Sequence, residues 1–189
     1  MPVKTLTTDR LVLRPPCLED AEALFERYAG DPGVTHFLTW PTHQSIEETI
    51  AFLRSKWSPE SPKSRWVLCV DGDEAPSGMI SAIHDGHTRT LGYALSKTLW
   101  GQGVMTEATR LVAEHLWRDP TVWRIDAHTH VDNVGSQRVL EKAGFRREGV
   151  LRRAFKIARC GDIPQDAVMY SQTRDDLNRT PAPEGDAGR

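Results

Sequence analysis

Apolar residues near the start of the chain follow first the spacing of a strand and then that of a helix. Residues 11–14 form a β-prone run, and two prolines end it because proline has no donor for a sheet ladder. Apolar residues then recur at i, i+3, i+4 and i+7, which predicts a helix with one buried face, ending near Gly30. They are Ala21, Leu24, Phe25 and Tyr28. A capping box over residues 45–48 predicts a second helix, to about Trp57.

The middle of the chain changes to strand patterns. Short β-prone runs cover residues 66–70, 79–83 and 91–95. Acidic and glycine residues between them, at 71–73 and 85–87, have the composition of tight turns. The three runs therefore predict an antiparallel meander.

The second half of the chain alternates helix and strand patterns. Helices are predicted over residues 106–117 and 133–143, and strands over 123–129, 145–153 and 167–171. This order predicts one α/β domain over residues 8–174. Residues 175–189 have little to bury, so we expect them to form a loose tail.

Composition excludes several classes of protein. The chain has 189 residues, 39% of them hydrophobic, which fits one globular domain and excludes a fully disordered chain. The longest apolar run, residues 66–70, is far short of the ~20 residues that cross a bilayer, and the N-terminus does not resemble a secretory signal. We expect a cytoplasmic protein that is not a membrane protein. A net charge of −2 gives no reason to expect a nucleic-acid partner.

The cysteines and tryptophans receive structural interpretations. The three cysteines are widely separated and lack CxxC or CxxH spacing, so we predict neither a disulfide framework nor a metal site. Trp66, Trp117 and Trp123 are expected in the core or close to it.

Gly101 and Gly103 lie between a predicted strand and a predicted helix. Glycines let the backbone turn tightly and approach a ligand closely, and the free amides at a helix start attract an anion such as a pyrophosphate. The turn is neither the dinucleotide fingerprint nor the P-loop, and a glycine turn of this kind can also be a plain helix cap.

A second stretch strengthens the ligand interpretation. Along the helix predicted after Asn133, Ser136 shares the i, i+3, i+4, i+7 face with Val139, Leu140 and Ala143. That spacing turns a hydroxyl to the buried side of the helix, where burying an apolar residue would cost less free energy. The alternative is a helix serine bonded to the preceding turn.

Three stretches of this sequence carry a family resemblance. They are Thr8-Asp9-Arg10-Leu11-x-Leu13-Arg14, Leu99-Trp100-Gly101-x-Gly103-x-x-Thr106-Glu107-Ala108 and Asn133-x-x-Ser136-x-Arg138-Val139-Leu140-Glu141-Lys142-x-Gly144-Phe145. In this order they resemble the GNAT superfamily of acyl-CoA-dependent N-acetyltransferases and, within it, the ribosomal-protein N-terminal acetyltransferases. The resemblance implies a mixed, mostly antiparallel, twisted sheet of six to seven strands with helices on both faces. It also implies a central splay, between the strands that end at Leu95 and Thr129.

The resemblance also implies acetyl-CoA as the cosubstrate, with no metal. The turn amides would hold its pyrophosphate, and Leu95 and Asn133 would contact the pantetheine arm. The implied cofactor residues are Leu95, Trp100, Gly101, Gln102, Gly103, Val104, Met105, Thr106, Asn133 and Arg138. Met105 stands where the family has a small residue, which affects the expected fit of the loop.

Acetyl transfer needs an acid for the thiolate and a base for the amine. By resemblance, Ser136 is the candidate acid. For the base, the family often has a glutamate before Leu91, where this chain has Thr90. We favour His128, because the ordinary pKa of histidine suits proton transfer near neutral pH, although it can equally be a solvent-facing strand residue. The other candidates are Asp126, His84, Asp85 and Glu107.

The expected function is transfer of an acetyl group from acetyl-CoA to a primary amine in a ternary complex. The acceptor is a protein N-terminal α-amine or a small-molecule amine, with an antibiotic or a polyamine as alternatives. A non-catalytic CoA-binding or interaction module is the alternative of another class, in view of Thr90 and Met105. The loops over residues 29–45 and 156–165 are expected to set the acceptor. A homodimer is compatible with the family.

Overall fold

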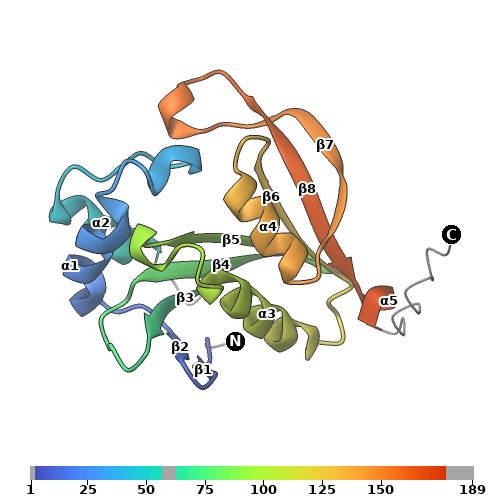
Figure 1. Ribbon diagram of the computed structural model, residues 1–189, viewed down its shortest axis with the longest axis horizontal. Coiled ribbons are helices and arrows are strands. Elements are labelled where there is room, and N and C mark those ends of the chain that lie inside the picture. The colour runs from blue at the N-terminus through green and yellow to red at the C-terminus, as the bar shows by residue number, and fades with distance from the viewer. Residues whose placement is uncertain (1–2, 57–62, 178–189) are drawn as a thin grey trace, which may run out of the picture.

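The computed structural model describes residues 3–56 and 63–177. In these residues eight strands form one sheet in the order β1-β2-β3-β4-β5-β6-β8-β7, and every neighbouring pair is antiparallel except β5 and β6 (Figure 1). The strands are β1 (Leu6–Thr7), β2 (Leu11–Arg14), β3 (Lys63–Val70), β4 (Gly78–Asp85), β5 (Thr88–Leu95), β6 (Arg124–His130), β7 (Arg146–Phe155) and β8 (Gln165–Thr173). The predicted mixed sheet is confirmed, with one strand more than expected. The additional strand, β1, has only two residues, which is too short to show a periodic pattern in the sequence.

Four helices lie close to the predicted positions, whereas a short fifth helix, Arg174–Leu177, covers the first residues of the segment that we expected to be a loose tail. Residues 178–189 of that tail lie outside the described residues. The helices are α1 (Ala21–Leu24), α2 (Ile46–Lys56), α3 (Val104–Trp117), α4 (Val134–Lys142) and α5 (Arg174–Leu177), with 3-10 turns η1 (Leu18–Asp20), η3 (Thr35–Phe37), η4 (Lys97–Leu99) and η5 (Ala158–Cys160). The first predicted helix is only partly α-helical, because it continues from α1 as a π-helical turn, η2 (Phe25–Ala29). The predicted end of the second helix at Trp57 lies outside the described residues. No helix in the described ranges is long and apolar enough to cross a membrane.

Helices cover both faces of the sheet, as predicted (Figure 1). On one face, α3 and α4 pack over the main core through Val112 and Leu140. On the other face, α1 and α2 pack through Leu24 and Leu53 over Val67 of β3. The two faces follow from the alternation of side chains along each strand.

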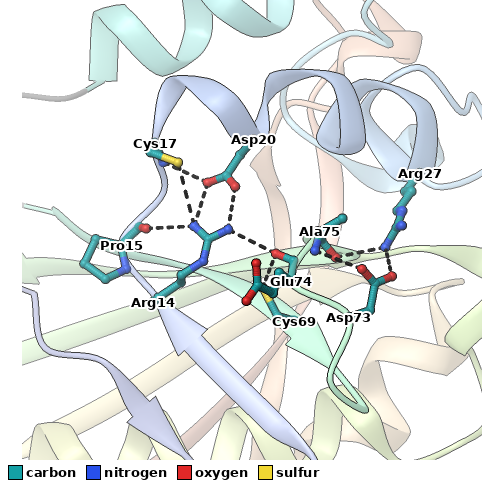
Figure 2. A network of polar contacts seen from close by, with 9 residues as sticks. All are labelled: Arg14, Pro15, Cys17, Asp20, Arg27, Cys69, Asp73, Glu74 and Ala75. Atoms are coloured by element: carbon teal, nitrogen blue, oxygen red, sulfur yellow. Dashed lines mark hydrogen bonds and ion pairs between the residues drawn. The ribbon is translucent and has the colours of Figure 1, made fainter.

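An ion-pair network fastens the α1 layer to the sheet (Figure 2). The Arg14 guanidinium at the end of β2 donates to both oxygens of the buried Asp20 carboxylate, at 2.9 and 2.6 Å, and the Cys17 amide donates to one of them at 2.8 Å. Arg27 of η2 donates to Asp73 in the β3–β4 turn at 2.8 Å. The hydrogen bond to Asp20 is the main cause of a raised pKa at Arg14. Removing one partner of such a buried pair costs about 3–5 kcal/mol.

Two local predictions need correction. Trp123 is 54% exposed instead of near the core, because it lies in the turn before β6, where the Arg174 guanidinium covers its ring at 5.8 Å. Trp66 is buried and Trp117 packs at the core edge, as expected. The predicted capping box has the Glu48 carboxylate accept from the Ser45 amide. The carboxylate accepts instead from the Gln44 amide, at 3.0 Å.

The strands β5 and β6 diverge in the middle of the sheet. They pair in parallel only where Thr88–Thr90 face Arg124–Asp126, although β5 continues to Leu95 and β6 to His130. The predicted splay is therefore confirmed. It opens the sheet at the point where the glycine turn and the start of α4 meet.

Candidate active site

A cavity of about 520 Å³ lies at the splay. Its walls come from the end of β5, the glycine turn, the first turns of α3 and α4, and the segment around η3. Nine of the ten predicted cofactor residues line it: Leu95, Trp100, Gly101, Gly103, Val104, Met105, Thr106, Asn133 and Arg138. Gln102 is absent from the lining and its side-chain amide donates to the Thr98 carbonyl at 2.7 Å.

The edge of β5 presents backbone groups to this cavity. The Ser96 amide donates to the Ser77 carbonyl at 2.8 Å, on the β4 side. Because backbone groups alternate in direction along a strand, those of Tyr93 and Leu95 point the other way, into the splay. The Leu95 carbonyl accepts from the Trp100 indole nitrogen at 2.8 Å, so strand and turn are joined directly.

The glycine turn has the geometry of an anion cradle. Gly101 and Gly103 both have φ of +76°, a left-handed conformation that favours glycine. Gly103 is the N-cap of α3, and no side-chain cap hydrogen bond is made there within the described ranges. A Cβ at Gly101 would meet no atom within 4 Å, so ligand atoms can come close to the backbone there. The amides at the start of α3 are therefore available to a negatively charged group.

Met105 does not disturb this cradle. Its side chain is 4% exposed and belongs to the main core beneath α3. The larger residue therefore fills space in the core beneath the turn.

Ser136 and Tyr93 meet in the cavity. The Ser136 hydroxyl lies 2.9 Å from the Tyr93 hydroxyl, which also donates to the Ser136 carbonyl at 3.3 Å. Asn133 caps α4 by accepting from the Ser136 amide at 3.1 Å, which fixes the first turn. Burial is the main cause of the raised pKa of Tyr93, so this hydroxyl stays protonated at neutral pH. Two hydroxyl groups thus adjoin the opening of the splay.

Comparison with known proteins places this arrangement in a family. The acetyltransferase (GNAT) domain family matches residues 10–146, which is more than half of the chain. The chain belongs to the GNAT acetyltransferase family. GNAT enzymes use acetyl-CoA, and the chain is accordingly an N-acetyltransferase by family.

Three relatives illustrate the match. An uncharacterised N-acetyltransferase of Bacillus subtilis, YoaA, is 32% identical over 88% of this chain and 94% of its own. The probable N-acetyltransferase YjcK of the same organism is 47% identical over 70 residues, 37% of this chain and 39% of its own length. The fold is also that of RimL, a ribosomal L7/L12 α-N-protein acetyltransferase solved with coenzyme A (TM-score 0.78, 20% identity, 92% of this chain and 99% of that one).

Of the base candidates for a GNAT reaction, Glu107 is already engaged. Its carboxylate accepts from the Thr8 hydroxyl at 2.5 Å and from the Arg10 guanidinium at 2.7 Å. Burial acts to raise the pKa of Glu107, but these two hydrogen bonds outweigh it and the net shift is downward. A carboxylate held in this way is a poor proton acceptor. His84 and Asp85 end β4 at its hairpin with β5, at the other end of β5 from Leu95.

Asp126 and His128 lie on the β6 face away from the main core. Asp126 is buried, with one carboxylate oxygen accepting from Arg124 at 2.9 Å and the other without a partner in the described part of the chain. His128 is exposed, lies edge-on to Phe155 with ring centroids 5.4 Å apart, and is not in the cavity lining. The structure therefore places the favoured base away from Ser136.

His130 is a residue that the sequence did not single out. It is buried at the end of β6 and stacks on Phe37 of η3 with ring centroids 5.1 Å apart. Its Nδ1 accepts from the Asp132 amide at 3.1 Å, so a neutral ring carries its proton on Nε2. Phe37 lines the cavity, so this stack supports a second part of its border. Only the fold brings the two residues together.

The tip of the β7–β8 hairpin lies beside the η3 segment (Figure 1). At its tip, the Ala158 amide donates to the Leu38 carbonyl at 3.1 Å and the Arg159 guanidinium donates to the His36 carbonyl at 2.9 Å. The Arg159 guanidinium also lies over the Phe37 ring at 5.8 Å. The predicted acceptor loops, residues 29–45 and 156–165, are thus in direct contact with each other.

Proposed function

We propose that this GNAT protein transfers the acetyl group of acetyl-CoA to a primary amine by direct transfer in a ternary complex. The observation that carries the proposal is the cavity at the splay, because it joins the glycine turn, the open edge of β5 and the Ser136–Tyr93 hydroxyl pair. A site with these three parts can hold a phosphate, an extended arm and a leaving group at once.

The cosubstrate fits the groups that line the cavity. The amides that follow Gly101 and Gly103 would hold the pyrophosphate, and the backbone of Tyr93 and Leu95 would pair with the pantetheine amides. Asn133, at the start of α4, would contact the same arm from the other wall. Backbone contacts of this kind depend on shape more than on side-chain charge.

In the proposed reaction the amine nitrogen bonds to the acetyl carbon and the carbon–sulfur bond breaks. The thiolate sulfur takes a proton from the Ser136 hydroxyl, which lies 2.9 Å from the Tyr93 hydroxyl, and the serine oxygen regains a proton from water. The proton lost by the amine goes to a base. We keep His128 in this role, acting through water from the exposed face of β6.

The cavity favours a single α-amine, such as a peptide N-terminus, over a polycationic acceptor. Among the described residues that line it, none is acidic. Polyamines and aminoglycoside-type antibiotics carry several positive charges, which need carboxylates as partners. Acetylation of a small amine remains the alternative acceptor class.

The decisive experiment is an acceptor screen of the full chain with acetyl-CoA, read by thiol release. We expect turnover with a subset of peptide N-termini and little with polyamines. Ser136→Ala should lower kcat by about 100-fold or more, while acetyl-CoA affinity stays within about twofold. Tyr93→Phe, which removes only the partner hydroxyl, should lower kcat less.

Acetyl-CoA binding without turnover on any amine, in the unaltered protein and in both variants, would support a non-catalytic CoA-binding module. Failure to bind acetyl-CoA would overturn the whole proposal. We also propose that the catalytic domain spans residues 8–174 and acts in the cytoplasm, which cell fractionation can test, and size-exclusion chromatography can test for a homodimer.

A further inference from the structure

The N-terminal strand segment reaches the glycine turn through a chain of side-chain contacts. Thr8 accepts from the Leu11 amide at 3.1 Å, and its hydroxyl donates to Glu107 Oε1 at 2.5 Å. Arg10 Nε donates to the other oxygen of the same carboxylate at 2.7 Å. Both oxygens of a residue in the first turn of α3 are thus held by the segment that leads into β2.

Arg10 also contacts the turn itself. Its two terminal nitrogens both lie 3.3 Å from the Gln102 carbonyl, between the two glycines. A Cβ at Gly103 would lie 3.7 Å from the guanidinium, so the side chain passes directly along the turn. The Glu107 amide in turn donates to the Gly103 carbonyl at 3.0 Å. One guanidinium therefore links the backbone of the turn to the first turn of the helix.

The geometry of the guanidinium suits this role. Its planar fork presents Nε to the carboxylate and the terminal nitrogens to the carbonyl at the same time, which the single ammonium of lysine cannot reproduce. The carboxylate stays ionised at neutral pH, because the hydrogen bonds of Thr8 and Arg10 outweigh its burial. The hydrogen bonds that Thr8 and Arg10 donate to the Glu107 carboxylate are therefore both charge-assisted.

We propose that Arg10 and Glu107 are positioning residues for the turn that holds the pyrophosphate. By fixing the Gln102 carbonyl relative to the start of α3, they set the direction of the amides that follow Gly101 and Gly103. This inference rests on the proposed function, since it assigns those amides to acetyl-CoA. It gives the Thr8-Asp9-Arg10 stretch a role in cofactor binding, although it begins more than 90 residues before the turn.

A truncated cosubstrate separates positioning from general stabilisation. S-acetylpantetheine carries the thioester and the pantetheine arm but has no pyrophosphate. If Arg10 acts through the turn, Arg10→Ala should raise KM for acetyl-CoA about tenfold with kcat nearly unchanged, and should leave kcat/KM for S-acetylpantetheine within about twofold. Equal losses with both substrates, or no loss with acetyl-CoA, would overturn the inference.

Two further variants keep the test decisive if Arg10→Ala folds poorly. Arg10→Lys retains the charge without the fork, and Glu107→Gln retains the shape without the charge. Both should raise KM for acetyl-CoA by about threefold or more, and unchanged values in both would contradict the proposal. Arg27→Ala is the matched control, because Arg27 has an exposure similar to that of Arg10 and forms an ion pair with Asp73, with no hydrogen bond to the glycine turn. It should leave the KM values for both substrates unchanged.

Failure of the inference and failure of the proposed function give different results. Calorimetric titration of the unaltered protein with acetyl-CoA comes first. No binding there overturns the proposed function and this inference together. Binding by the unaltered protein, with the same affinity in Arg10→Ala, overturns the inference alone.

Discussion

The two borders of the cavity are built in different ways. The glycine-turn border is lined by residues close in sequence: Leu95, Trp100 and Gly103 lie within nine positions, and the Trp100 indole donates to the Leu95 carbonyl. The other border is the Phe37 ring with the two residues packed on it, His130 and Arg159, which come from η3, β6 and η5 and meet only through the fold. In the proposed function, the glycine-turn border would hold the cosubstrate, and the side chains gathered at the other border would contact the acceptor.

The strongest test of this comparison replaces Gly103. Valine adds a Cβ at a left-handed position beside the amides of α3, so Gly103→Val should weaken acetyl-CoA binding by at least tenfold, or about 1.4 kcal/mol. Gln102→Ala should change it little, because that side chain points out of the cavity. Calorimetric titration of each variant, with its thermal midpoint checked, provides the measurement.

A control for backbone strain is available at Gly86. It has φ of +51° in the exposed turn between β4 and β5, at the other end of β5 from Leu95, so Gly86→Val introduces similar strain away from the cavity. Its thermal midpoint should fall by an amount similar to that of Gly103→Val, while its acetyl-CoA affinity stays native. Equal acetyl-CoA affinities in all the variants would show that the glycine turn is not part of the cofactor site.

A substitution at the Phe37 border should affect acceptor binding more than acetyl-CoA binding. Phe37→Ala removes the ring that stacks on His130 and supports Arg159. We expect KM for the amine acceptor to rise about fivefold, roughly 1 kcal/mol, the scale of one aromatic pair. The dissociation constant for acetyl-CoA should stay within about twofold. A larger effect on acetyl-CoA than on the acceptor would contradict the division of the cavity into two borders.

The smallest expected effect concerns stability on the β6–β8 side. The pKa of Glu148 is lowered to about 2, mainly by hydrogen bonds from Arg124. A lowered pKa in the folded state contributes stability that is present above the ordinary value of 4.5 and is lost as the pH falls towards 2. Because the Glu148 side chain is 40% exposed, we expect only about 1 kcal/mol.

Urea unfolding of Glu148→Gln from pH 7 to pH 2.5 checks this contribution. The variant should be less stable than the unaltered protein at pH 7, and the difference should shrink below pH 4.5. Acetyl-CoA affinity at pH 7 should not change. A difference in stability that is constant over this range would assign the effect to packing instead of charge.

The sequence predicted the elements whose signal is local. The single strands of the meander, the glycine turn and the face of α4 that carries Ser136 each follow from a pattern over fewer than ten residues, and they lie where expected. Tyr93 was missed as the partner of Ser136, although alternation along β5 puts it on the same face as Leu91 and Leu95. That pattern was readable, but nothing in it shows which hydroxyl from another element lies opposite.

Other residues could not be placed from local pattern. The contact of His130 with Phe37 joins positions more than 90 residues apart, and it depends on how β6 diverges from β5. Trp123 was expected near the core from its size alone. It lies in the connection before β6, where its exposed ring packs against the Arg174 guanidinium at the surface. In both cases the chain path decides the environment of the side chain.

The hydrogen bond from the Trp100 indole to the Leu95 carbonyl also has an entropic consequence. With the Leu99 amide bonded to Ser96, the Trp100 amide to Lys97 and the Gln102 side chain to Thr98, it orders the connection before any ligand arrives. Ordering a flexible backbone costs about 1–2 kcal/mol per residue. A preformed turn avoids that cost at the moment of binding, so its affinity for an anion reflects contacts made and little conformational freedom lost.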